Sequence, residues 1–343
     1  MNGEAVKLPL PAVEAVCSPR QEELEYLVGF FDGDGCVSMK EKTGEVQLVI
    51  SQNIDSAEVL LRFRSLLGGS VYRHSAPTGS KKAQVQWRVY RSNMVAAAAE
   101  TLSRVPSMKK AQLLIAAKGN VPKSDRPRLA QCLRMFKRRQ HVPDEWLECS
   151  WPYFAGLFDA EGCILVRPSS VSLKLRLVQV NPCVLVHLVT FLHAKQIRRW
   201  AVYHGPSSSE LVCSNLWDCK QTLELLLENG LFVKRRQALL ALALKAENDL
   251  QIRDAISSLK GLQGRYKRLD SAGVSRAREI KRLQDRLHYI AGPERATMMS
   301  QIDELRAEHN LQKLISRCDL LRKDMRQSLR QGGRMVPPTT CSS

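Results

Sequence analysis

A nine-residue motif that occurs twice constrains the fold of this chain more than any other feature. Residues Leu27–Gly35 (LVGFFDGDG) recur 127 residues further on as Phe154–Gly162 (FAGLFDAEG). Self-similarity at one fixed offset is the mark of a duplicated structural unit. The motif therefore predicts a chain built from two copies of one unit.

The similarity continues beyond the motif, in the same order in both copies. Each motif is followed by two short runs with β-type patterning, a helix that opens on a capping residue, a second strand pair and an apolar helix with Lys-x-x-Gln. The expected strands are residues 36–40, 47–51, 70–74 and 83–90 in the first copy, and 163–167, 173–178, 200–204 and 210–213 in the second. This order predicts an α+β fold of two pseudo-symmetric αββαββα repeats with antiparallel sheets.

Breakers and changes of pattern divide the chain into five parts. Between the repeats lies a basic segment with three prolines, and after about residue 246 only helical periodicity remains. The expected parts are a first repeat at 20–120, a helical linker at 121–149, a second repeat at 150–246, a basic helical extension at 247–330 and a disordered tail at 331–343.

The charge of the chain points to a polyanionic partner. There are 52 Lys and Arg against 34 Asp and Glu, which gives a formal net charge of +18, and such a field attracts nucleic acid over a long range. An anionic membrane would need an apolar run of spanning length, and the sequence has none, nor a signal peptide. The ten cysteines form no CxxC pair, which argues against a zinc finger.

The motif itself carries groups suited to metal chemistry. Gly29 and Gly156 fall in the middle of predicted helices, where glycine is costly unless it permits close helix–helix approach. Asp34 and Glu161 then fall at the helix C-terminal ends, where a carboxylate is electrostatically unfavourable. If the two helices pack together, both acids converge on one point. Paired carboxylates there suit Mg²⁺, the ion used for phosphodiester hydrolysis.

On these residues the chain resembles the LAGLIDADG homing endonucleases, specifically a single-chain member with two motifs. The resemblance spans both repeats, roughly residues 22–245. It implies a monomeric, site-specific endonuclease for double-stranded DNA that takes part in intron homing. Such an enzyme makes a staggered double-strand break in a long pseudo-palindromic target by Mg²⁺-dependent hydrolysis.

The resemblance also implies which groups bind the metal. Two or three Mg²⁺ ions would be shared between the eighth-position acids, Asp34 and Glu161. The preceding residues, Gly33 and Ala160, would each lend a backbone carbonyl. The sixth-position acids, for which the resemblance implies a mainly structural role, are Asp32 and Asp159.

Further catalytic groups follow from the same resemblance. A basic residue near each scissile phosphate corresponds to Lys109 and Lys234. A glutamine that orients water corresponds to Gln52 in the first repeat. Its counterpart in the second repeat stays open between Gln179 and Asn181.

Polar side chains on the expected sheets are candidates for contact with DNA bases in the major groove, because Arg and Lys read guanine and Gln and Asn read adenine. The candidates are Ser38, Lys40, Lys42, Arg73, Gln84, Gln86 and Arg88 in the first repeat, and Arg167, Lys174, Arg176 and His204 in the second. Basic residues expected to touch phosphates are Arg134, Lys137, Arg138 and Arg139. Polar alternation is also typical of any half-exposed sheet.

One alternative function stays open. Some proteins similar to this family bind intron RNA as maturases or splicing factors without cutting DNA, and the basic extension after residue 246 suits that reading. The presence of all four of Asp34, Glu161, Lys109 and Lys234 favours the nuclease, since a binding protein has no need of them. We expect an intracellular protein, with an organelle (chloroplast or mitochondrion) favoured over the nucleus, and no membrane partner.

Overall fold

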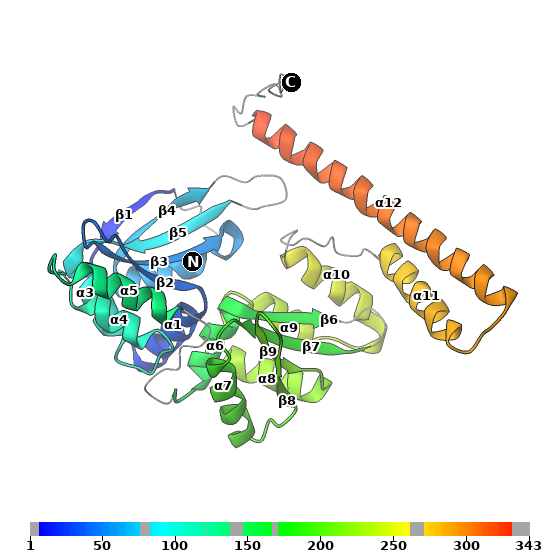
Figure 1. Cartoon of the computed structure of the whole chain (residues 1–343), viewed down its shortest axis with the longest axis horizontal. Coiled ribbons are helices and arrows are strands. Elements are labelled where there is room, and N and C mark those ends of the chain that lie inside the picture. Colours follow the sequence, from blue (N-terminus) through cyan, green and yellow to red (C-terminus); the bar gives the residue numbers. More distant parts are fainter. Residues whose placement is uncertain are drawn as a thin grey trace. The chain divides into compact units, whose positions relative to one another are not determined.

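The computed structural model describes residues 7–75, 83–119, 121–137, 147–166, 171–260 and 271–330 (Figure 1). They fall into two compact units. The first holds both repeats and runs to Ile256, and the second begins at Ser257. The predicted tail at 331–343 lies outside the described residues, as do Arg138, Arg139 and Arg167.

The first repeat contains the predicted elements and one additional strand. Its motif helix is α1 (Gln21–Asp34). The strands are β1 (Leu10–Val13), β2 (Gly35–Met39), β3 (Val46–Asn53), β4 (Gly69–Ser75) and β5 (Gln84–Val89). The other helices are α2 (Glu58–Leu67), α3 (Ser92–Leu102) and α4 (Lys110–Ala117), with a short 3-10 turn at Ile54–Ser56 before α2.

The second repeat has the same order of elements. Its motif helix is α6 (Trp151–Glu161), which the Ser150 side chain caps by accepting a hydrogen bond from the Tyr153 amide. The strands are β6 (Gly162–Val166), β7 (Leu173–Gln179), β8 (Trp200–His204) and β9 (Ser209–Cys213). The helices are α7 (Cys183–Ala194), α8 (Leu216–Glu228) and α9 (Arg235–Leu242). The predicted α+β duplication is confirmed.

The two sheets are antiparallel and share one strand order. The second has four strands in the order β6-β7-β9-β8, and the first has the equivalent β2-β3-β5-β4. The expectation of four strands is wrong for the first sheet, because β1 pairs with β4 and adds a fifth. Its four residues include a proline and show no period-two burial, so the sequence carries no strand signal there.

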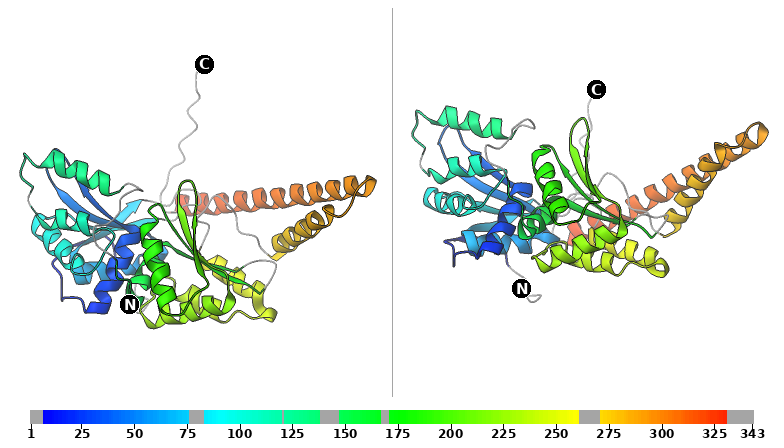
Figure 2. Two further views of the ribbon diagram at one scale, coloured as in Figure 1. Left: turned by 60° about the horizontal axis from the view of Figure 1, so that its bottom comes forward. Right: turned by 90° about the horizontal axis from the view of Figure 1, so that it is seen from below.

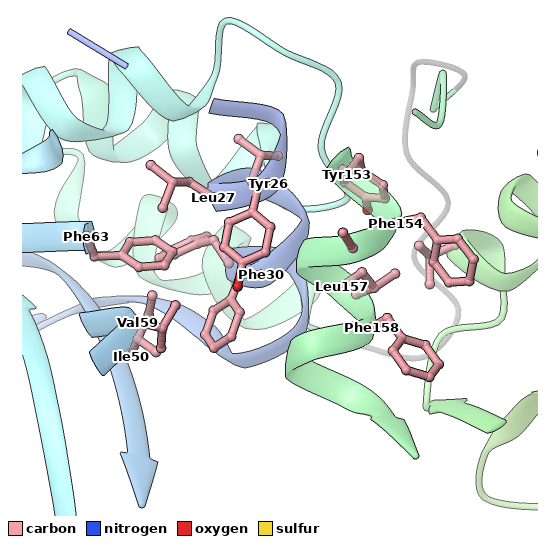
Figure 3. Packing of buried hydrophobic residues seen from close by; sticks show 14 of the residues in the cluster. Tyr26, Leu27, Phe30, Ile50, Val59, Phe63, Tyr153, Phe154, Leu157 and Phe158 are labelled. Carbon is pink, nitrogen blue, oxygen red and sulfur yellow. The ribbon is translucent and has the colours of Figure 1, made fainter. Parts of the chain in front are cut away.

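The motif helices lie side by side at the centre of the first unit, with one sheet on each outer flank (Figure 2). Their apolar residues are buried, and Figure 3 shows Phe154 and Phe158 on the side of α6 that faces away from α1. On the first side Phe63 of α2 links Phe30 to Trp87, with ring centroids 5.7 and 5.2 Å apart. On the second side Phe154 packs against Trp200 at 6.0 Å. Each half therefore has its own aromatic core behind its motif helix.

Two further helices belong to the first unit, at least in part. The linker between the repeats contains α5 (Arg126–Phe136), whose Arg126 donates to the Lys42 carbonyl and so ties α5 to the β2–β3 turn. After α9 and a 3-10 turn at Ala246–Asn248 comes α10 (Asp249–Lys260), with Ile252 and Ile256 buried.

The second unit is a pair of helices, α11 (Ser271–Leu287) and α12 (Pro293–Arg330). Leu283 and Ile302 are buried in this pair, and Arg276 forms an ion pair with Glu308 at 3.3 Å. Residues 288–292 separate the two helices, and α12 begins at Pro293. None of the helices described here combines the length and apolar character needed to cross a membrane.

Candidate active site at the paired helix ends

The two motif helices touch at their glycines. A methyl group added to Gly29 would lie 2.0 Å from the Tyr153 carbonyl oxygen, and one added to Gly156 would lie 2.0 Å from that of Tyr26. Real side chains do not come so close to a backbone atom, so only glycine allows this crossing. The prediction of a close helix–helix approach is confirmed.

This crossing brings the last turns of both helices together. Asp34 is the final residue of α1 and Glu161 the final residue of α6. A methyl group at Gly33 would lie 2.4 Å from Ala160 Cβ and 3.1 Å from Glu161 Cγ. The acid of one half is thus next to the end of the other helix, as the sequence predicted.

The pairing of acids changes the ionisation of Asp34. Burial and the charge of Glu161 raise the pKa of Asp34 from 3.8 to about 7, while Lys234, Lys109 and the Gln52 amide act in the opposite direction. Both carboxylates also lie at helix C-termini, where the helix dipole opposes negative charge. The site therefore holds negative charge that the protein alone compensates only in part.

Two lysines stand at the same place. Lys109 Nζ donates to the carbonyls of Phe31, at 2.7 Å, and Gly35 at the end of α1. Lys234 Nζ donates to the Asp159 carbonyl at the end of α6. Burial lowers the pKa of each ammonium group, whereas nearby acids raise it, and these acids include both Asp34 and Glu161 in each case. The two acids and two lysines form one cluster of charges.

The sixth-position acid of the first motif is buried behind this cluster. Asp32 accepts hydrogen bonds from Ser107 Oγ at 2.6 Å, the Met108 amide at 2.8 Å and the Lys109 amide at 3.2 Å. It also accepts one from the Tyr153 hydroxyl, on the other motif helix, at 2.8 Å. Such contacts satisfy free amides at the start of α4, which agrees with the structural role implied for this residue.

Asp159 occupies the equivalent position in the second half. It accepts hydrogen bonds from the amides of Phe232 at 2.6 Å, Val233 at 2.9 Å and Lys234 at 2.8 Å, just before α9. The Tyr26 hydroxyl of the opposite helix donates to it at 2.7 Å. Sequence reasoning missed both tyrosines, although the offset of 127 that relates the motifs also relates Tyr26 to Tyr153.

The strand register identifies the second-half counterpart of Gln52. Gly35 pairs with Ile50 in the first sheet, and Gly162 pairs with Leu177 in the second. Two residues further along each strand are Gln52 and Gln179. Asn181 lies beyond β7, and its side chain accepts from the Cys183 amide at the start of α7.

The two glutamines differ in their contacts. The Gln52 amide nitrogen donates to Asp34. The Gln179 amide nitrogen is buried and, among the described residues, has no hydrogen-bond partner. The active-site half that contains Glu161 therefore lacks the amide contact that Asp34 has.

The residues present fit a hard divalent cation. Two carboxylates, with backbone carbonyls beside them, are the oxygen ligands that Mg²⁺ accepts alongside water and phosphate. Burial and then the charge of Glu161 raise the pKa of Asp34, and a cation bound beside the two acids would act in the opposite direction. Within the described ranges, no three His, Cys, Asp or Glu side chains gather into another possible metal site.

The first sheet presents a polar outer face. Register and burial place Gln84, Gln86 and Arg88 on it, opposite the buried Val85, Trp87 and Val89, as predicted. Their neighbours on this face include Ser38, Gln47, Ser51, Asn53, Ser70 and Tyr72. Several bond to each other, for example Gln47 to Ser38 at 2.8 Å and Gln86 to Ser51 at 2.9 Å.

Other first-repeat candidates lie around this face. Lys40 follows β2 and forms an exposed ion pair with Glu45 at 2.7 Å, and Lys42 lies exposed in the same turn. Lys137, just after α5, reaches the outer face through a 3.4 Å contact with Cys36 Sγ. Arg134 of α5 is paired with Glu41 at 3.3 Å.

Two candidates lie on the opposite face of their sheets. Arg73 and Gln52 both pair with Val85, from the strands on either side of it, and so share its face of the sheet. In the same way His204 and Gln179 both pair with Ser209. Both residues are exposed at the open end of that face. They stand in equivalent positions near the two glutamines rather than among the polar residues of the outer faces.

The outer face of the second sheet is more apolar. Lys174 and Arg176 lie on it, and Arg176 is paired with Glu210 at 3.0 Å. Among the described residues, this face also includes Glu210 and the mostly apolar Cys163, Leu165, Val178, Ala201, Tyr203 and Val212. Leu165 and Tyr203 are 37% and 60% exposed.

No family model and no curated protein matches the chain. Among solved structures, the meganuclease I-SmaMI bound to uncleavable DNA is 12% identical with a TM-score of 0.49, and the match covers 70% of this chain and 98% of that chain. The same meganuclease bound to uncleaved DNA in the presence of calcium ions is 11% identical with a TM-score of 0.43, and covers 84% and 98%.

A second protein is similar to the chain at the same level. The LAGLIDADG meganuclease I-AabMI bound to uncleaved DNA is 18% identical with a TM-score of 0.47, and the match covers 76% of this chain and 98% of that one. It carries the name of the LAGLIDADG family, which the two nonapeptides resemble.

Proposed function

We propose that this chain is a site-specific DNA endonuclease that makes a double-strand break by divalent-metal-dependent phosphodiester hydrolysis. The observation that carries the proposal is the cluster of Asp34, Glu161, Lys109 and Lys234 at the paired ends of α1 and α6. Two acids and two half-buried lysines at one point cost stability. A structural interface has no need of that arrangement, whereas hydrolysis of a phosphodiester uses both kinds of charge.

The residues of the cluster divide the work. Asp34, Glu161 and the carbonyls of Gly33 and Ala160 would hold Mg²⁺, with two or three ions shared between the halves. A bound ion supplies positive charge for the phosphate oxygens and lowers the pKa of water. Gln52 fixes the orientation of the Asp34 carboxylate through its amide. Lys109 and Lys234 bring positive charge to the two scissile phosphates.

The surroundings of the cluster suit a long duplex. The net charge of +18 favours a polyanion at long range. The outer face of the first sheet offers amide and guanidinium groups of the types that read base edges. The cluster has one acid and one lysine from each half, so each half would cut one strand of a single pseudo-palindromic target.

The RNA-binding alternative, a maturase on the same scaffold, uses the same basic surfaces but leaves the charge cluster without a purpose. It predicts tight binding to an intron RNA with no cleavage of any matching duplex.

The proposal is tested by selection of cleaved sites from a random duplex library. The full chain is incubated with the library in Mg²⁺, and in EDTA as the control, and the cut ends are sequenced. We expect one enriched, staggered and pseudo-palindromic site in Mg²⁺ only. Absence of enriched cut ends in Mg²⁺, or equal cutting in EDTA, would contradict the proposal.

A further inference from the structure

Two tyrosines cross between the halves next to the cluster, and the activity proposed above gives them no role. Tyr26 and Tyr153 immediately precede the two motifs and are almost fully buried, at 3% and 2% exposed. Each hydroxyl donates to the sixth-position acid of the other half, Tyr26 to Asp159 and Tyr153 to Asp32. Figure 3 labels Tyr26 on α1 and Tyr153 on α6.

The backbone of each tyrosine is also held by a contact with the partner helix. Its carbonyl oxygen is the atom against which the glycine of the partner helix packs. The Tyr26 ring is further covered by the Arg62 guanidinium, 5.3 Å from the ring centroid. Burial raises the pKa of both hydroxyls well above the ordinary value of 10.0, so they remain protonated and act as donors.

The acceptor acids in turn fix the lysines. Asp32 accepts from the Lys109 amide, and Asp159 accepts from the Lys234 amide. Each lysine is the residue that precedes helix α4 or α9, so its backbone position sets where the side chain begins. The ammonium groups then reach back to the ends of the motif helices.

A buried carboxylate with several donors is rigid, and loss of one donor is costly because the charge stays buried. Without the Tyr153 hydroxyl, Asp32 loses the one hydrogen bond that it accepts from the opposite motif helix in the part of the chain that the structure describes. The carboxylate can then turn, and the start of α4 with Lys109 can move with it.

We propose that Tyr153 is a positioning residue for Lys109 and that Tyr26 is a positioning residue for Lys234. Each cleavage centre is thereby set by a side chain from the opposite half of the chain. The inference rests on the proposed endonuclease function. It makes the position of each lysine depend on a hydrogen bond from the opposite half of the chain.

The test uses strand-resolved cleavage on the target found by selection, with a different label on each strand. Lys109→Met and Lys234→Met first identify the strand whose cleavage each lysine serves. Tyr153→Phe and Tyr26→Phe are then measured under saturating DNA. Tyr289→Phe is the control, since it removes the same hydroxyl from a side chain that is 90% exposed.

The expected pattern is crossed. Tyr153→Phe lowers the cleavage rate by about tenfold or more on the strand that Lys109→Met also affects, the loss typical of a hydrogen bond to a buried charge. It changes the cleavage rate of the other strand by less than about threefold. Tyr26→Phe does the reverse. A double variant with both Tyr153→Phe and Lys109→Met should cut the affected strand about as slowly as Lys109→Met alone, because the tyrosine acts through the lysine.

Three results would overturn the inference. They are equal slowing of both strands by either tyrosine variant, slowing of the wrong strand, and no slowing of either. If Tyr153→Phe does not fold, Tyr26→Phe alone decides the test, on the strand that Lys234→Met slows. An unchanged rate on that strand would equally overturn the inference. A wild-type chain that cuts neither strand would instead refute the proposed function.

Discussion

At the scale of single residues, the two motif acids are not equivalent. Asp34 has the Gln52 amide as a donor and carries a pKa raised to about 7 by burial and by Glu161. Glu161 has one more methylene, and the glutamine at the matching register position, Gln179, has a buried amide nitrogen without a partner in the described structure. A duplicated site has thus become two related but different centres.

The destabilisation caused by the negative charge of Asp34 can be measured in the metal-free protein as a change in the free energy of unfolding. Since its pKa is raised from 3.8 to about 7, the ionised carboxylate costs stability that builds up as pH rises through this window and is complete above it. Asp34→Asn in EDTA at pH 8 should therefore raise the free energy of unfolding by about 1–2 kcal/mol after allowance for solvent screening.

Thermal melts with and without Mg²⁺ check this prediction. The wild type should be stabilised by Mg²⁺, as any ligand of the native state requires, and Asp34→Asn should lose most of that gain. Asp285→Asn removes an exposed acid and serves as the control. A lower metal-free melting temperature for Asp34→Asn than for this control would contradict the account of the site.

The two glutamines offer a matched pair of substitutions. Gln52→Ala removes the donor to Asp34 and should slow cleavage of one strand by about ten- to a hundredfold, the usual worth of a hydrogen bond to a charged group. Gln179→Ala removes an amide that makes no such bond and should change either rate by less than about threefold. Nicked intermediates in a time course report both rates, and a larger effect of Gln179→Ala would refute the asymmetry.

At the scale of elements, the crossing of α1 and α6 leaves no room for a side chain at either glycine. The atom that a methyl group on Gly29 would strike is a backbone oxygen at 2.0 Å, which no side-chain rotation can move. Gly29→Ala should lower the free energy of unfolding by more than about 2 kcal/mol, measured by urea denaturation. A loss below 0.5 kcal/mol, on the order of an ordinary surface substitution, would show that the helices separate easily.

The two sheets differ in what they offer to DNA. The first has Gln84, Gln86 and Arg88 on its outer face, together with other polar residues. On the second, Leu165 and Tyr203 are among the exposed residues, and the Arg176 guanidinium is paired with an acid. Amide and guanidinium groups discriminate base pairs more strongly than apolar contacts do.

This difference predicts an unevenly specified target. Single base-pair changes in the half-site read by the first sheet should each reduce cleavage by about ten- to a hundredfold, and most changes in the other half-site should be tolerated. Cleavage of a complete set of singly substituted targets measures this. Gln84→Ala identifies the half-site of the first sheet, and equal penalties in both half-sites would contradict the prediction.

The sequence predicted most elements because their signals are local. The duplicated motif, the glycines within it and the alternation of Gln84–Val89 each depend on neighbours along the chain. The strand Leu10–Val13 has no such signal and exists because the edge of β4 was free to pair. Its existence is a tertiary effect that no short window contains.

The candidate site shows the same division. The acids and lysines follow from the repeat, and so could Gln179, because the offset of 127 persists from the motif through β7. The face on which Arg73 and His204 lie depends on strand register. A one-residue error in where a strand is expected to begin moves every side chain to the other face. The cross-half hydrogen bonds of Tyr26 and Tyr153 depend on how two helices meet, which the sequence of either helix leaves open.

At the scale of the whole molecule, one compact unit contains everything that the proposed chemistry uses. Both motifs, both sheets and the charge cluster lie before Ser257. Residues after it form a separate helical pair in which Leu311, Leu314 and Ile315 are exposed. The proposed cleavage therefore depends on the first unit, and within it on the two acids, Asp34 and Glu161, that meet between the halves.

The most direct measurement is cleavage of the selected target by Asp34→Asn and by Glu161→Gln in Mg²⁺, with duplex affinity measured in parallel. Both substitutions keep the shape of the side chain and remove its negative charge. The account predicts that each abolishes double-strand cleavage while the affinity for the duplex stays within about threefold of the wild type. Wild-type cleavage rates in both variants would contradict it.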